Sequence, residues 1–159
     1  MPRNPSCTDC DLCQSASTVC IFGEQRGNGS SPQIMIVGEA PGATEDALGR
    51  PFVGKSGDEL KRILDRAGID SYYVTNVVKC FPAGTPEPGH VKACKPYLEE
   101  EIKDVQPKYI LALGNTAWHR FGRGPITENA GKEIYSAALG CWVFPALHPA
   151  AILRAPGRR

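Results

Sequence analysis

Short apolar runs alternate along this chain with stretches in which apolar residues recur at the spacing of a helix. Four runs have the length and the β-branched or aromatic character of buried strands, at residues 34–37, 72–78, 109–113 and 142–147. Helical spacing follows the first three runs, at residues 56–68, 91–105 and 116–121. This alternation predicts an α/β fold, a three-layer α/β/α sandwich whose central sheet is four-stranded and mostly parallel.

The boundaries of these elements carry local signals. Ser56 is expected to cap the first helix, with Glu59 reaching back to the helix start and Gly68 ending the helix. Pro96 inside the second helical stretch indicates a kink or a late helix start. Residues 21–32 are expected to form a surface connection into the first strand. We see no internal repeat and expect a single domain over residues 1–159.

A long glycine-rich stretch, residues 38–55, links the first predicted strand to the first predicted helix. Loops of this length are usually functional or disordered. Its sequence is too specific for disorder, because the glycines permit close backbone approach while Glu39, Glu45 and Phe52 supply two carboxylates and one flat apolar face. The stretch therefore predicts a ligand site.

The ends of the predicted strands add polar residues to the same place. Ligands of open parallel sheets bind beyond the carboxyl ends of the strands. These positions hold Gly38, Glu39, Asn76, Asn115 and His148. Taken singly, Asn76 is equally typical of a turn, and His148 of a structural histidine. Their expected convergence on one rim favours a site that combines a carboxylate, an amide and an imidazole.

Length and charge narrow the class of protein. The 159 residues suffice for a domain with a sizeable core, and a net charge of +1 neither favours nor excludes nucleic acid as a partner. No apolar run approaches the roughly 20 residues that span a bilayer. The N-terminus lacks the apolar segment of a secretion signal. We therefore expect a cytoplasmic protein that does not associate with membranes.

The seven cysteines point to a metal. The first twenty residues hold four of them, and three follow much later: Cys7, Cys10, Cys13 and Cys20, then Cys80, Cys94 and Cys141. An odd number in a chain without an export signal disfavours a disulfide framework. A CxxC pair from the Cys-rich segment 7–20, joined by two later cysteines, gives four thiolates, which suit zinc or an iron-sulfur cluster. Free buried thiols are the alternative.

Five motifs, in order, resemble one known family. GEAPGATED at 38–46, GRPFVG at 49–54 with its following helix, TNVVKC at 75–80, a later helical cysteine and HPAAILR at 148–154 are together similar to the family 4 uracil-DNA glycosylases. This family is the iron-sulfur branch of the uracil-DNA glycosylase superfamily. The resemblance extends from Cys7 to Arg154. Any one of these motifs is weak, whereas the five in this order are highly specific.

The resemblance implies a DNA-repair enzyme that hydrolyses the N-glycosidic bond of deoxyuridine, releases uracil and leaves an abasic site. It implies a monomer that acts on uracil-containing DNA, single- or double-stranded. A [4Fe-4S] cluster, with zinc as the alternative, is implied on Cys7, Cys10, Cys80 and Cys94. The implied catalytic residues are His148, Glu39 and Glu45. The implied substrate-binding residues are Gly38, Ala40, Gly42, Phe52 and Asn76.

Some features depart from the family pattern and keep a second hypothesis open. Ala130 stands where the family tends to carry an arginine, the loop between Cys80 and Cys94 is short, and few residues follow Arg154. The alternative is a catalytically weak or inactive iron-sulfur module that binds nucleic acid with the same fold. The carboxylates, the aromatic ring, the amide and the imidazole of the predicted site stand against this alternative.

Overall fold

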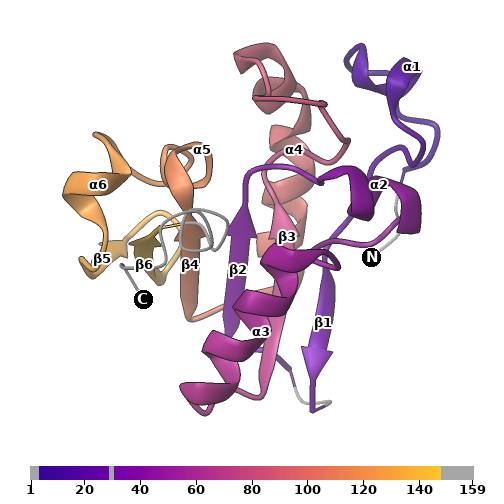
Figure 1. The fold of residues 1–159 in the computed structure, drawn as a ribbon. Coiled ribbons are helices and arrows are strands. Elements are labelled where there is room, and N and C mark those ends of the chain that lie inside the picture. Colours follow the sequence, from indigo (N-terminus) through magenta and orange to yellow (C-terminus); the bar gives the residue numbers. More distant parts are fainter. Residues whose placement is uncertain (1–3, 29–30, 148–159) are drawn as a thin grey trace.

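The computed structural model describes residues 4–28 and 31–147, and a six-stranded sheet forms its centre (Figure 1). In spatial order the strands are β1 (Glu24–Gly27), β3 (Ser71–Asn76), β2 (Ile34–Gly38), β4 (Tyr109–Leu113), β6 (Cys141–Ala146) and β5 (Ile134–Ser136). The inner four strands are parallel, which confirms the predicted α/β fold and its parallel core. The outer two pair antiparallel, so the sheet is mixed and wider than the four strands predicted.

The two edge strands escape the sequence pattern for a physical reason. Alternate residues of β1 are exposed, and β5 is three residues long with none of them fully buried. Such strands are held by backbone pairing to one neighbour rather than by a buried apolar run. The expectation of a plain connection over residues 21–32 is therefore wrong, because β1 lies within it.

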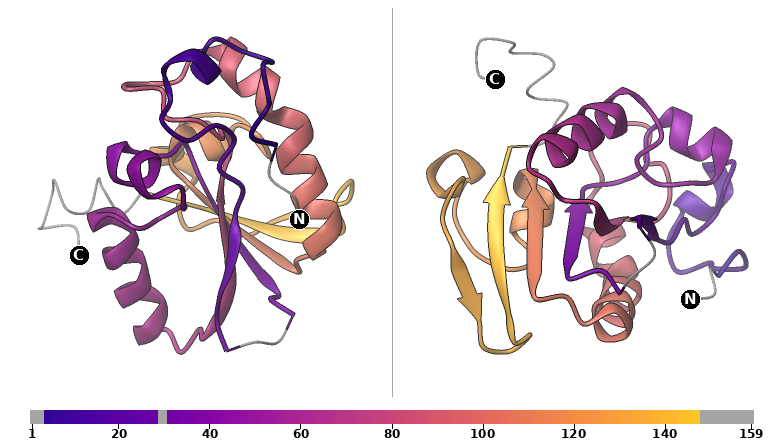
Figure 2. Two further views of the ribbon diagram at one scale, coloured as in Figure 1. Left: turned by 90° about the vertical axis from the view of Figure 1, so that its right-hand side faces the viewer. Right: turned by 90° about the horizontal axis from the view of Figure 1, so that it is seen from below.

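Helices cover both faces of the sheet. They are α1 (Leu12–Ser15), α2 (Ala43–Leu48), α3 (Lys55–Arg66), α4 (Pro88–Val105), α5 (Gly114–Trp118) and α6 (Ile126–Asn129). Figure 2 shows α3 and α4 on opposite sides of the sheet. Alternate residues of β2 face the two layers, since Ile36 belongs to the same core cluster as Leu60 of α3, and Met35 to the same cluster as Leu98 of α4. In the part of the chain that is described, no helix is long and apolar enough to cross a membrane.

Two helix starts differ from the expectation. The N-cap of α3 is Gly54, without a side-chain hydrogen bond, so the predicted Ser56 cap is wrong and Ser56 lies inside the helix. Helix α4 begins at Pro88, earlier than expected, and continues through Pro96. Proline is well suited to a first helical position, because its missing N–H has no partner there in any case. The glycine-rich stretch 38–55 also contains a short helix, α2.

A buried ion pair joins α4 to the end of β3. Lys79 and Glu101 are both fully buried, and the Lys79 ammonium donates directly to the Glu101 carboxylate. Lys79 also donates to Thr75 Oγ1 at 2.6 Å and to the Asn76 carbonyl at 2.7 Å. Glu101 accepts from the Tyr73 hydroxyl at 2.6 Å. These hydrogen bonds make burial of both charges tolerable, and they fix the end of β3 where the sequence predicts a ligand.

Replacing Glu101 by alanine is expected to lower the free energy of unfolding by about 3–5 kcal/mol, because the substitution leaves the Lys79 charge buried without its partner. Urea denaturation followed by circular dichroism measures this loss. The matched control is Glu100→Ala at the exposed neighbouring position of α4, which should change stability by less than about 0.5 kcal/mol. Equal effects of the two substitutions would show that the pair does not stabilise the fold.

Candidate functional site

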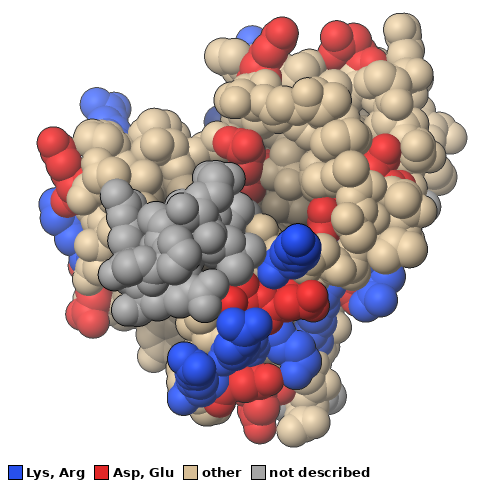
Figure 3. Space-filling model, viewed as in Figure 1, with Lys and Arg blue, Asp and Glu red and all other residues tan. Residues whose placement is uncertain are grey.

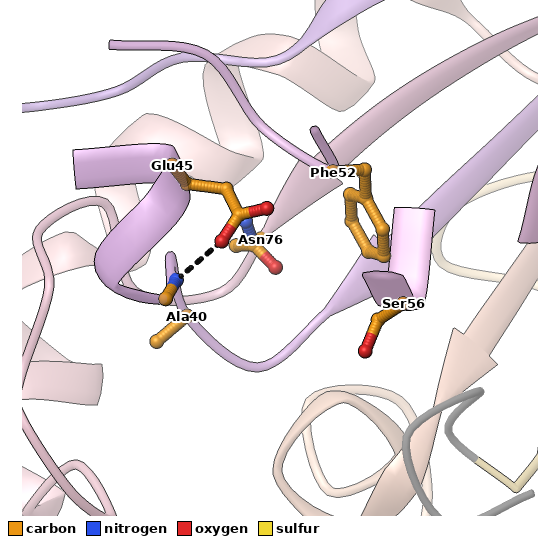
Figure 4. A pocket seen from close by; sticks show the side chains of 6 residues that line it. Ala40, Glu45, Phe52, Ser56 and Asn76 are labelled. Carbon is orange, nitrogen blue, oxygen red and sulfur yellow. Dashed lines mark hydrogen bonds between the residues drawn. The ribbon is translucent and has the colours of Figure 1, made fainter. Parts of the chain in front are cut away.

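A small pocket opens beyond the carboxyl ends of β2 and β3, where the sequence predicts a ligand. Its volume is about 140 Å³, and its walls are formed by Ala40, Gly42, Glu45, Phe52, Ser56 and Asn76 (Figure 4). Drug-sized ligands occupy roughly 300–1,000 Å³, so this pocket suits a single small ring. Four of the predicted substrate-binding residues line it, and the fifth, Gly38, lies directly against two of them.

Asn76 reaches the pocket from the last position of β3. The parallel register places it beside Gly38, the last residue of β2. Asn76 is 3% exposed, and the described residues offer its side-chain amide no hydrogen-bond partner. A Cβ atom on Gly38 would stand 2.6 Å from Asn76 Oδ1, so a glycine is needed at that position. The amide donor and acceptor are therefore both available to a ligand.

Phe52 presents its ring to the same pocket from a strained backbone. Its φ of +51° lies in the left-handed region that non-glycine residues rarely adopt. Arg26 of β1 holds this conformation, since its guanidinium donates to the Phe52 carbonyl at 2.8 Å and also to the Pro51 carbonyl. Phe52 is 7% exposed, because one side of its ring packs into the core beneath α3 while another lines the pocket.

The Glu45 carboxylate holds the backbone of the loop on the far side of the Phe52 ring. One carboxylate oxygen accepts from the Gly42 amide at 3.0 Å, a bond drawn in Figure 4. The other oxygen accepts from the amides of Val53 at 2.9 Å and Gly54 at 2.7 Å. Both oxygens of Glu45 are thus bound to backbone that surrounds the pocket.

Glu39 stands at the exit of β2 but is not among the residues that line the pocket. Its Oε2 atom accepts from the Thr116 hydroxyl of α5 at 2.6 Å, and both residues are half-buried. The structure therefore places the two predicted catalytic carboxylates in different surroundings. One is bound by three backbone amides, and the other by a single hydroxyl.

The remaining site prediction, His148, lies outside the described residues and stays a prediction. Ser56, which was expected to cap a helix, lines the pocket instead. Arg26 and Thr116 were not singled out from the sequence. Their roles depend on hydrogen bonds to distant carbonyls and to a distant carboxylate, and no local motif indicates such bonds.

Charges around the pocket are mixed in sign. Figure 3 shows Lys and Arg side chains interspersed with acidic ones over α3, below a hollow in the surface. Within that helix Lys61 pairs with Asp65 and Arg62 with Glu59. Lys55 at the start of the helix is exposed and immediately precedes pocket-lining Ser56. Positive charge near the pocket is therefore local rather than spread over the whole face.

A second cavity gathers six of the seven cysteines. Its walls include Cys7, Cys10, Cys13, Cys20, Cys80 and Cys94. The structure thus brings together the four implied metal ligands, with two further thiols beside them. The N-terminal cysteines lie beside Cys94 because α1 lies near the start of α4 (Figure 1).

Backbone amides point at two of these sulfur atoms. The Cys20 amide donates to Cys80 Sγ at 3.2 Å, and the Lys79 amide donates to Cys94 Sγ at 3.4 Å. Amide donors of this kind stabilise the thiolate, which is the form that binds metal. Burial raises the pKa of Cys94 to about 12, since a thiolate there loses its hydration, and a cation among the sulfurs would offset that cost. The donor set fits a thiolate-ligated metal centre.

Within residues 4–28 and 31–147, no three His, Cys, Asp or Glu side chains are arranged to hold one metal ion. A tetrahedral zinc site needs each sulfur about 2.3 Å from the same centre. The cysteines line one cavity, but among the described residues no three of them are placed to bind the same ion.

The chain matches known proteins over most of its length. The model of the uracil DNA glycosylase superfamily matches residues 24–159. A type-4 uracil-DNA glycosylase from Thermotoga maritima is 40% identical, with 96% of this chain and 80% of that protein covered. Another from Pyrobaculum aerophilum is 41% identical over 79% of this chain and 70% of that protein. A third, from Sulfurisphaera tokodaii, is 37% identical over 97% of this chain and 74% of that protein. By its sequence motifs, its fold and these matches, the chain belongs to the uracil DNA glycosylase superfamily.

Proposed function

We propose that this chain is a DNA-repair glycosylase that hydrolyses the N-glycosidic bond of deoxyuridine in DNA, releases uracil and leaves an abasic site. The observation that carries the proposal is the ring-sized pocket in which the Asn76 amide, without a partner among the described residues, stands near the ring of Phe52. Membership of the superfamily and the names of the relatives support it. The substrate is uracil-containing DNA, single- or double-stranded, and the enzyme works as a monomer.

Asn76 reads the edge of the base. Its amide carries a donor and an acceptor side by side, which matches O4 and N3–H of uracil. Cytosine presents the reversed pattern and would leave buried polar groups mispaired, which is costly. Discrimination requires that the amide keep one orientation. Asn76 is buried, and a Cβ at position 38 would stand 2.6 Å from its Oδ1 atom, so the side chain has little room to move.

Phe52 supplies a stacking surface for the base. A uracil inside a duplex must be swung out of the stack to enter the pocket, at a cost of a few kcal/mol. Stacking on an aromatic ring offsets about 1–3 kcal/mol of this cost. Single-stranded DNA avoids the unpairing and is accepted for that reason.

Bond cleavage develops negative charge on uracil O2 and positive charge on the sugar. His148, carried by the HPAAILR motif, is the proposed donor to O2, since a preorganised donor at a developing charge is usually the largest catalytic contribution. Among the loop amides, that of Gly42 is already bound to Glu45. It therefore contributes to the shape of the pocket rather than to stabilisation of O2.

Glu39 is the carboxylate that we assign to the attacking water. A group that positions water needs an oxygen with a free lone pair near the sugar, and both Glu45 oxygens are occupied by backbone amides. Glu39 has one oxygen bound to Thr116, and its other oxygen has no partner among the described residues. Under this assignment Glu39 positions the attacking water and offsets the positive charge of the sugar. Glu45 holds the backbone of the loop.

The cysteine cavity holds a [4Fe-4S] cluster on Cys7, Cys10, Cys80 and Cys94, with zinc as the alternative metal. Four cysteine thiolates are the usual ligands of such a cluster, and the cavity gathers the four named cysteines. When bound, the cluster supplies a covalent link between the N-terminal segment and the start of α4. A site filled by four protein thiolates has no position for substrate, so its role is structural.

Uracil release from an oligonucleotide with a single deoxyuridine tests the proposed function. We expect release from single- and double-stranded forms, and none from the same sequence with deoxycytidine. Asn76→Ala is expected to slow release about 100-fold, because two hydrogen bonds of about 1.4 kcal/mol each are lost. A wild-type protein that shifts uracil-containing DNA in a gel but releases no base would instead be a binding module.

Gly38→Ala tests the pocket itself. The added Cβ would stand 2.6 Å from Asn76 Oδ1 and 2.7 Å from Phe52 Cζ, so both base contacts must move. We expect kcat/KM for uracil release to fall about 100-fold. Gly89→Ala in α4 is the matched control, because nothing lies within 4 Å of its Cβ position. If both variants keep wild-type kcat/KM, the pocket is not the base site.

Metal analysis tests the cysteine cavity. Protein purified without oxygen is expected to be brown and to contain about four iron and four sulfide per chain. Cys94→Ser should lose most of this content, whereas Cys141→Ser in β6 should keep it, since Cys141 is outside the cavity. Colourless protein with one bound zinc would replace the cluster by the alternative metal.

A further inference from the structure

The Thr116 hydroxyl and the Glu39 carboxylate come from two neighbouring strand exits. Glu39 directly follows β2, and α5, which carries Thr116, directly follows β4. These two strands pair in parallel, so their ends lie side by side. Thr116 Oγ1 donates to Glu39 Oε2 at 2.6 Å across 77 residues of sequence. The hydroxyl therefore serves a distant carboxylate rather than the backbone of its own helix.

Helix α5 is a rigid support for this hydroxyl. Ala117 and Trp118 are buried in the core, and the Asn115 side chain accepts from the Ile126 amide at 2.8 Å. Threonine is also branched at Cβ, which restricts its own rotation. Residues on both sides of Thr116 are thus anchored, and the donor is fixed before any ligand arrives.

We propose that Thr116 is the positioning residue for Glu39, holding the carboxylate in the orientation in which its second oxygen binds the attacking water. The inference rests on the proposed hydrolysis of deoxyuridine and on the assignment of Glu39 to the water. A glutamate side chain has several rotatable bonds and would otherwise sample many orientations at the rim. A donor on one oxygen selects one of them and leaves the other oxygen for the water, which is the preorganisation that a hydrolytic site needs.

Thr116 offers a nearly isosteric test. Thr116→Val removes the hydroxyl and keeps the shape, whereas Thr116→Ser keeps the hydroxyl. Under single-turnover conditions on uracil-containing single-stranded DNA, Thr116→Val is expected to lower the rate of base release about tenfold and to leave the DNA concentration for half-maximal rate within about twofold. Thr116→Ser should restore the rate to within about threefold of wild type. Thr127→Val, at an exposed position of α6, is the matched control and should have no effect.

A double mutant separates a positioning role from a merely structural one. If Thr116 acts through Glu39, adding Thr116→Val to Glu39→Gln should slow release no further than Glu39→Gln alone. A structural contact would instead lower the thermal midpoint and slow release equally in both backgrounds. An unchanged rate for Thr116→Val, a Ser variant as slow as the Val variant, or additive losses would each overturn the inference.

The same experiments distinguish a failure of the proposed function from a failure of the role of Thr116. Wild-type protein that releases no uracil would overturn the glycosylase itself. Active wild type with a slow Glu39→Gln variant and a normal Thr116→Val variant would overturn only the role of Thr116. Active wild type with a normal Glu39→Gln variant would overturn the assignment of the water to Glu39 and, with it, this inference.

Discussion

The pocket depends on one short strained loop, residues 50–54, whose backbone is held from two directions. A left-handed backbone costs a residue such as Phe52 about 1–2 kcal/mol and persists only where the surroundings enforce it. Arg26 binds the carbonyls on one side of the ring, and Glu45 binds the amides that follow it. Helix α3 closes against the loop, since a Cβ on Gly57 would lie 2.1 Å from the Phe52 carbonyl oxygen. The Phe52 ring is thus held in place before any ligand arrives, so that binding does not have to meet the cost of ordering it.

The same constraint explains why we assign different roles to Glu39 and Glu45. A carboxylate that accepts three backbone hydrogen bonds has its lone pairs committed to the fold. In the proposed function Glu45 therefore supports the loop that carries Phe52 and does not bind the attacking water. Glu39 is bound at one oxygen only and by a side chain that is itself anchored. Residue type and motif position do not separate these two glutamates, whereas their hydrogen-bond partners do.

Elements whose buried residues form an apolar run or a regular spacing were predicted correctly from the sequence. The run Tyr109–Leu113 is recovered residue for residue as β4, and the expected convergence of Gly38 and Asn76 follows from their parallel register. Features that depend on backbone hydrogen bonds were not predicted. Strand β1 has no apolar run, the cap of α3 falls to Gly54 without a side-chain bond, and the role of Arg26 depends on two distant carbonyls. The role of His148 remains a prediction.

One segment, residues 75–80, serves both the pocket and the cysteine cavity. Asn76 faces the pocket, and four residues later Cys80 lines the cavity, while Lys79 between them binds the Asn76 carbonyl and its amide contacts Cys94 Sγ. Every residue of this segment is buried and closely packed. A shift of Cys80 is therefore transmitted to Asn76, because no flexible residues lie between them. A metal centre bound by Cys80 and Cys94, as proposed, would thereby influence catalysis without touching the substrate. By fixing Cys80 and Cys94 it would also fix the position of the Asn76 amide in the proposed base site, where errors of about 1 Å cost about 100-fold in rate.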